Sequence, residues 1–120
     1  VAFAGEVTLK NNVTIGMGST IHQGITIGSC AMIGMGAAVI ENIPPFTTYA
    51  GVPAKKIKIN EIKLKRLGVS AKLIKLIKDV MIKNLPIKKI KLNTSDRKYF
   101  KILEDWINKN RHRGLRIESY

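Results

Sequence analysis

The chain has 120 residues, and 21 Lys and Arg against 8 Asp and Glu give it a formal net charge of +13. Its one cysteine, Cys30, excludes an intramolecular disulfide, which fits a reducing compartment. The uncharged stretch 11–40 is too rich in Thr, Asn, Gln and Gly to span a membrane, and the start at Val1 has neither an initiator Met nor a signal peptide. We therefore expect a cytoplasmic protein whose present sequence begins inside a fold.

The charge lies almost entirely in the second part of the chain. Residues 1–42 contain a single basic residue, Lys10, whereas the rest carries the other 20. Such an excess predicts anionic partners, which include phosphates, acidic proteins, nucleic acid and anionic lipid, although some lysines will only solvate the surface. The shift in composition predicts the last coils of a solenoid over 1–45, an exit loop over 46–60 and a basic α-helical domain over 61–120.

The first 42 residues divide into seven units of six that share one pattern. The third position of each unit is large and apolar, and the first is mostly small or aliphatic. The third positions are Phe3, Leu9, Ile15, Ile21, Ile27, Ile33 and Val39, and Gly16, Gly28 and Gly34 follow three of them. A period of six fits neither a helix nor a hairpin meander, but it fits the sides of a coil with about 18 residues per turn.

In such a coil the large aliphatic residue fills the inside, the small residue fits an inward corner, and Gly allows unusual or close backbone geometry. The pattern therefore predicts a left-handed parallel β-helix, with a β-sandwich of accidental spacing as the alternative. Slightly more than two turns bury little core, so we expect further coils on the N-terminal side.

The sequence after the repeats predicts an exit from the coil and then helices. The Pro44–Pro45 pair removes backbone donors, so the coil should end there. Ser70 can cap a helix that Asn84–Pro86 should close, and Thr94 or Ser95 can cap a second helix. The two apolar stripes, which we interpret as packing faces, are Leu73, Ile74, Ile77, Val80 and Met81, and Tyr99, Phe100, Leu103, Trp106 and Ile107.

Five short motifs carry a resemblance to a known family. They are Ala4–Gly5, Ile21–His22–Gln23, Ile43–Pro44–Pro45–Phe46, Asn60 with Leu64–Lys65–Arg66 and Gly68, and Arg113–Gly114–Leu115. In type and spacing they resemble the acyl-carrier-protein-dependent UDP-N-acetylglucosamine O-acyltransferases of lipid A biosynthesis. The likeness runs along essentially all of this chain, but it corresponds only to the last part of the longer family proteins.

The resemblance implies a homotrimer of left-handed β-helices, each followed by a small α-helical domain, with active sites in the clefts between neighbouring subunits. Family members move a hydroxyacyl group from acyl carrier protein to the sugar 3-hydroxyl of the UDP-sugar, and they need no metal and no cofactor besides the carrier-protein thioester. The implied general base is a histidine on a coil upstream of this sequence. The 120 residues should therefore not catalyse alone.

The first group of implied site residues lies in the repeats. Gly5 matches a glycine whose backbone N–H stabilises the oxyanion of the thioester attack, and His22 and Gln23 match a pair that contacts substrate. The repeat itself predicts that His22 points outward, because Gly takes its position in neighbouring units; a surface histidine without chemistry is the alternative. By the 18-residue period, Gly5, Gln23 and Glu41 should stack on one edge. Glu6 departs from the family, where a histidine follows the glycine, so the resemblance does not determine the substrate contacts at this position or the choice of sugar or acyl chain.

The second group follows the repeats. Asn60 and Arg66 match residues that contact the nucleotide and its phosphates, and a guanidinium suits a diphosphate. Two neighbours depart from the family, because Ile62 replaces the usual acid and Leu67 replaces a second arginine. The implied nucleotide site is thus only partly retained. The lysine-rich helical half would suit docking of an acidic acyl carrier protein.

Two other functions stay open. The stretch Ala50–Lys55 resembles the exit loop of acetyl-CoA-dependent hexapeptide enzymes that acetylate sugar hydroxyl or amino groups, although the Arg113–Leu115 ending argues against them. A non-catalytic β-helix scaffold or basic binding module is the third function, because the base is missing. We do not expect nucleic-acid binding, since aromatic and basic residues are not interleaved.

Overall fold

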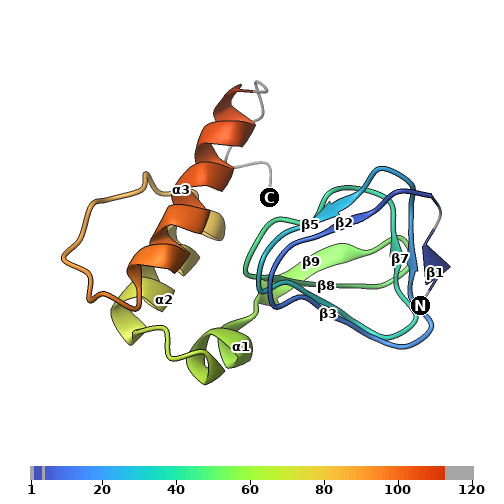
Figure 1. Ribbon diagram of the computed structural model, residues 1–120, viewed down its shortest axis with the longest axis horizontal. Helices are drawn as coiled ribbons and strands as arrows, with labels where there is room; N and C mark the ends of the chain where they lie inside the picture. Colours follow the sequence, from blue (N-terminus) through green and yellow to red (C-terminus); the bar gives the residue numbers. More distant parts are fainter. Residues whose placement is uncertain (1, 4, 113–120) are drawn as a thin grey trace. The chain divides into compact units, whose positions relative to one another are not determined.

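The computed structural model describes residues 2–3 and 5–112, with side chains as far as Lys109 (Figure 1). The chain forms two compact units, Val1–Asn60 and Glu61–Tyr120. The first unit consists of strands and the second of helices. No helix within the described residues is long and apolar enough to cross a membrane.

The first unit is a stack of short strands that form three sheets. In chain order they are β1 (Ala2–Phe3), β2 (Thr8–Leu9), β3 (Thr14–Ile15), β4 (Thr20–Ile21), β5 (Thr26–Ile27), β6 (Met32–Ile33), β7 (Ala38–Val39), β8 (Thr47–Ala50) and β9 (Lys55–Ile59). The strand orders are β1-β4-β7, β2-β5 and β3-β6-β8-β9. Figure 1 shows the turns of the chain lying on one another, from the blue β2 to the green β8.

Neighbouring strands of the coil are parallel and lie one turn apart. Phe3 pairs with Ile21, which in turn pairs with Val39, so that each turn takes 18 residues. Leu9 pairs with Ile27 at the same spacing on the second side. The predicted three-sided parallel coil is therefore confirmed, while its left hand stays a prediction.

The two apolar columns of the repeat fill the inside of the coil. Ile21, Ile27 and Ile33 from the third column are at most 1% exposed, and so are Ala31 and Ala37 from the first. Cys30 is also fully buried, which agrees with its interpretation as a packing residue. The hexad pattern thus identified the core correctly from Ile21 onward, whereas Phe3 and Leu9 of the same column are 47% and 46% exposed.

The last turn of the coil is two residues shorter than the others. Ile27 pairs with Ile43, and Ile33 pairs with Tyr49, at a spacing of 16 residues. The shortening leaves the N–H of Thr26 without the backbone carbonyl that its counterparts use, and the Asn42 side chain accepts this bond instead at 2.8 Å. A polar side chain therefore replaces a missing rung of the ladder.

This shortened turn corrects the predicted end of the coil. The chain does not leave the stack at Pro44–Pro45, because β8 still pairs in parallel with β6, and β9 then pairs antiparallel with β8. The expected exit loop over 46–60 therefore contains two strands. Counting in sixes placed Pro45 in the inward column, whereas the two-residue shortening brings Ile43 and Tyr49 inside, which are 3% and 7% exposed.

The second unit contains helices α1 (Glu61–Arg66), α2 (Ala71–Met81) and α3 (Arg97–His112). Ser70 caps α2 as predicted, since its hydroxyl accepts a hydrogen bond from the Leu73 N–H at 3.3 Å. The predicted stripe of α2 is buried, and on α3 Tyr99, Leu103 and Ile107 are buried. The predicted packing faces are therefore largely correct, with Phe100 and Trp106 half-buried.

The start of α3 differs from the prediction. Asp96, rather than Thr94 or Ser95, precedes the helix, and its carbonyl accepts hydrogen bonds from the N–H groups of Tyr99 and Phe100. Its carboxylate accepts hydrogen bonds from the N–H and the hydroxyl of Ser70, and Asp96 is only 1% exposed. The contact with Ser70, the cap of α2, therefore sets where α3 begins. Local helix propensity does not predict such a contact between distant residues.

Candidate functional site

Gly5 and Gln23 lie together at the corner that follows β1 and β4. Gly5 has a φ of +79°, and a Cβ built on it would lie 2.8 Å from Cγ of Gln23 and 2.9 Å from its Cδ. The Gln23 side chain therefore lies directly over the Gly5 backbone. The two corners are also bonded, because the N–H of Gly24 donates to the carbonyl of Glu6 at 2.7 Å. The expected juxtaposition of Gly5 and Gln23 on one edge is present.

The backbone N–H of Gly5 has no acceptor within the described residues. Gly5 is exposed, and neighbouring amides such as the N–H groups of Gly24 and His22 are used in the coil ladder. A backbone N–H at an exposed corner can donate to an oxyanion without any side chain. The Gln23 amide, which is exposed beside it, adds a donor and an acceptor at the same corner.

His22 precedes this corner and faces outward. Its backbone N–H donates to the carbonyl of Val39 at 2.9 Å, which holds the residue in the coil, while its side chain is exposed. The outward direction predicted from the repeat agrees with this placement. A contact between the imidazole and a substrate stays a prediction.

Asn60 lies at a different corner of the coil. Its side-chain amide donates to the carbonyl of Cys30 at 3.0 Å, and its backbone N–H donates to the carbonyl of Phe46 at 2.7 Å. Cys30 belongs to the corner after β5, whereas Gln23 belongs to the corner after β4. Asn60 is 6% exposed and joins the end of β9 to the coil, so the chain does not gather it with Gly5 and Gln23.

Arg66 ends α1 in the second unit. It is exposed and forms no ion pair with any described residue, whereas the preceding Lys65 pairs with Glu61 at 3.1 Å. An unpaired guanidinium is free to bind a phosphate. The two departures beside it are Ile62, which is 66% exposed where an acid was expected, and the half-buried Leu67.

Tyr49 is a residue that the sequence did not single out. It lies inside the shortened turn, 7% exposed. Burial, and then the negative charge of Glu41, raise the pKa of Tyr49 to about 12. The phenol of Tyr49 therefore stays neutral to a higher pH than that of an exposed tyrosine. Tyr49 points inward because this turn is two residues shorter than the others. The six-residue pattern of the sequence gives no sign of that shortening.

The motif Arg113–Gly114–Leu115, and Ala4 of the first motif, lie outside the described residues. Among the residues that the structure describes, no group of three or more His, Cys, Asp or Glu side chains is placed to hold a metal ion.

Known proteins similar to this chain are acyl- and acetyltransferases, although no family model matches it. The chain is 40% identical over 92 residues to an acyl-carrier-protein-dependent UDP-N-acetylglucosamine O-acyltransferase of Herminiimonas arsenicoxydans, a match that covers 73% of this chain and 35% of that protein. It is 50% identical over 50 residues to a serine acetyltransferase of Buchnera aphidicola, covering 42% of this chain and 19% of that one.

A third relative is the galactoside O-acetyltransferase of Escherichia coli, 44% identical over 56 residues that cover 47% of this chain and 28% of that protein. The chain thus spans between about a fifth and about a third of these relatives. A solved galactoside acetyltransferase in complex with coenzyme A is 39% identical and matches 51% of this chain and 30% of that one with a TM-score of 0.47.

Proposed function

Because the chain is a hexapeptide-repeat protein related in sequence to acyl- and acetyltransferases, we propose that it contributes to transfer of an acyl group from acyl carrier protein to a UDP-N-acetylglucosamine-type sugar nucleotide. We choose this reaction over acetyl transfer because of the lengths of the sequence matches. The O-acyltransferase match covers 73% of the chain, more than the strand unit alone, which is half of it. The acetyltransferase matches, at 42% and 47%, are shorter than that unit.

In the proposed reaction the sugar 3-hydroxyl attacks the thioester carbonyl of the acyl carrier protein. A carbon–oxygen bond forms, the carbon–sulfur bond breaks, and a histidine base supplied from outside this chain takes the hydroxyl proton. The exposed N–H of Gly5 would stabilise the oxyanion, and His22 and Gln23 would position the reacting groups. Asn60 and Arg66 would contact the nucleotide and its phosphates.

The placement of these residues favours a site shared between copies of the chain. Gln23 and Cys30, which binds the Asn60 amide, belong to successive corners separated by one side of the coil. Six extended residues span on the order of 15–20 Å, so within one chain the two corners are separated by about the length of an extended sugar nucleotide. A homotrimer that brings different edges of two subunits together would remove this separation.

A specific observation also favours an acetyl-CoA-dependent sugar acetyltransferase. The chain is 44% identical to the galactoside O-acetyltransferase over 56 residues, and the Ala50–Lys55 stretch that resembled the acetyltransferase exit loop forms the turn between β8 and β9. In this case the helical unit would have no role in binding the donor. A non-catalytic scaffold is the third function.

The three functions can be distinguished by testing which acyl donor supports transfer. We would assay the chain, alone and joined to any coding sequence that continues it upstream of Val1, with hydroxyacyl-acyl carrier protein or acetyl-CoA as donor and UDP-N-acetylglucosamine as acceptor. We expect transfer only from the carrier protein, only by the extended protein, and we expect Gln23→Ala to reduce it while Lys10→Ala does not. Transfer from acetyl-CoA alone would favour the second function, and no transfer from either donor the third.

A further inference from the structure

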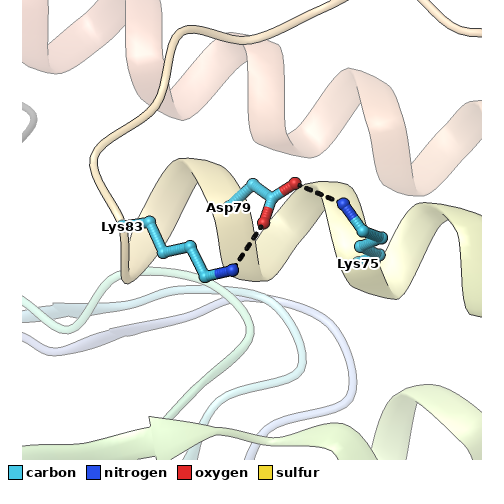
Figure 2. A network of polar contacts seen from close by, with 3 residues as sticks. All are labelled: Lys75, Asp79 and Lys83. Atoms are coloured by element: carbon cyan, nitrogen blue, oxygen red, sulfur yellow. Dashed lines mark hydrogen bonds and ion pairs between the residues drawn. The ribbon is translucent and has the colours of Figure 1, made fainter.

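Four of the eight lysines on the described helices of the second unit are paired with carboxylates. Lys65 and Lys78 both bind Glu61, and Lys101 binds Asp105 at 3.4 Å. Figure 2 shows Lys75 and Lys83 directed at the two oxygens of Asp79, at 3.1 and 3.6 Å. These pairs, with hydrogen bonds from the lysines as the main cause, lower the pKa of Glu61 and of Asp79. The helical surfaces therefore display less positive charge than the residue count indicates.

The segment between α2 and α3 has the opposite character. We call residues 82–95 the lysine linker; it contains no Asp or Glu. Lys88, Lys89 and Lys91 occur within four positions, are exposed, and pair with no carboxylate among the described residues. The nearest acid along the chain on the C-terminal side, Asp96, is buried on Ser70. The linker is thus a dense group of uncompensated charge.

Contacts within the unit hold the linker in place. The ammonium group of Lys72 on α2 donates a hydrogen bond to the carbonyl of Lys91 at 2.9 Å. Ile87 and Ile90 are half-buried, whereas the lysines between and after them are exposed. At the α2 end, Ile82 and Leu85 are 43% and 41% exposed beside this charge. A fixed cationic strip with a few apolar side chains beside it has the chemistry of a protein-docking surface.

We propose that the lysine linker, rather than a helix face, is where the acidic acyl carrier protein docks, an inference that rests on the proposed function. Two exposed apolar side chains are too few to insert into a bilayer, and no Trp, Tyr or Phe occurs in the linker to anchor it there. The same lack of aromatic residues removes stacking with nucleic-acid bases. Carboxylates of an acidic protein can pair with three closely spaced lysines, and apolar side chains of that protein can contact Ile82 and Leu85.

The test compares two variants that lose the same charge. Lys88→Gln/Lys89→Gln/Lys91→Gln removes the linker lysines. Its control, Lys65→Gln/Lys75→Gln/Lys101→Gln, removes three exposed lysines that are paired, and Glu61 and Asp79 keep a second lysine. Binding of hydroxyacyl-acyl carrier protein would be measured by fluorescence anisotropy at constant salt, with circular dichroism to verify that both variants keep their helices.

We expect the linker variant to raise the Kd about tenfold and the control variant to raise it less than about threefold. Equal weakening in both would mean that net charge alone attracts the partner, and no weakening in the linker variant would place docking elsewhere; either result overturns the inference and leaves the proposed donor standing. If the unmodified chain does not bind carrier protein, the donor assignment fails as well. Loss of binding to a DNA duplex or to phosphatidylglycerol vesicles in the linker variant, with carrier-protein binding unchanged, would also overturn it.

Discussion

Gly28 lies where the coil leaves the least room for a side chain. A Cβ built there would be 2.4 Å from the Pro45 nitrogen and 2.7 Å from its Cα, atoms that belong to the backbone of the shortened turn. Gly34 has the same position in its hexad, but its nearest neighbour would be Cβ of Ala50 at 3.1 Å. Equivalent positions of the repeat therefore differ in how strictly they require glycine.

This difference predicts unequal costs for two matched substitutions. Gly28→Ala should lower the free energy of unfolding of the strand unit by about 2 kcal/mol, because backbone must move, while Gly34→Ala should cost less than about 1 kcal/mol. Native-state hydrogen exchange of the Thr20 amide, which bonds to Ala37, would report both values. Equal costs would show that the shortened turn moves aside freely.

The phenol of Tyr49 should titrate far above its ordinary range. Ultraviolet absorbance of the phenolate should show a transition near pH 12 that is absent from Tyr49→Phe, and Glu41→Gln should lower this pKa only in part, because burial is the larger cause. Since the folded pKa is above the ordinary value of 10.0, the stability linked to Tyr49 is complete below pH 10 and is lost as the pH rises toward 12. A transition of Tyr49 near pH 10 would contradict its inward position.

At the scale of elements, one residue joins two helix starts. Asp96 precedes α3, and its carboxylate accepts hydrogen bonds from the N–H and hydroxyl of Ser70, the cap of α2. Its own N–H donates to the side chain of Asn93 at 2.8 Å. A buried carboxylate at the positive end of α2 is stabilised both by these bonds and by the helix dipole.

Removal of that carboxylate should weaken the helical unit selectively. Asp96→Ala leaves the Ser70 donors without an acceptor and should cost about 2–3 kcal/mol, and Asp96→Asn, which keeps one acceptor oxygen, should cost less. Urea unfolding followed by the fluorescence of Trp106 on α3 would measure both. The Thr20 amide in the strand unit is the internal control, and a matching loss of protection there would show that the two units do not unfold independently.

At the scale of the whole molecule, the proposed site requires more than one chain. We expect the protein to sediment at three times its chain mass of 13.3 kDa, because the proposed trimer would bring the Gly5–Gln23 corner of one copy beside the Asn60 corner of another. Sedimentation equilibrium over a range of concentrations would measure this mass. A monomer at every concentration would contradict the shared site and leave Asn60 with its packing role alone.

The sequence by itself determined the regular features of this protein. A six-residue period and two apolar columns predict three sides, an 18-residue turn and an inward Ile21, Ile27 and Ile33, because a repeated local pattern must be buried by stacking. The same period placed Gly5 and Gln23 on one edge. The cap at Ser70 and the apolar stripes of α2 and α3 were also predictable from the sequence, since caps and helical periodicity are local features.

Only the tertiary structure decided the rest. The shortened turn, with Asn42 replacing a backbone carbonyl and Tyr49 inside, breaks the period that the sequence reading depends on. The start of α3 at Asp96 and the pairing of Lys78 with Glu61 depend on which side chains meet across distant parts of the chain. Such contacts have no period and no local signature, so they follow from packing and not from any pattern along the sequence.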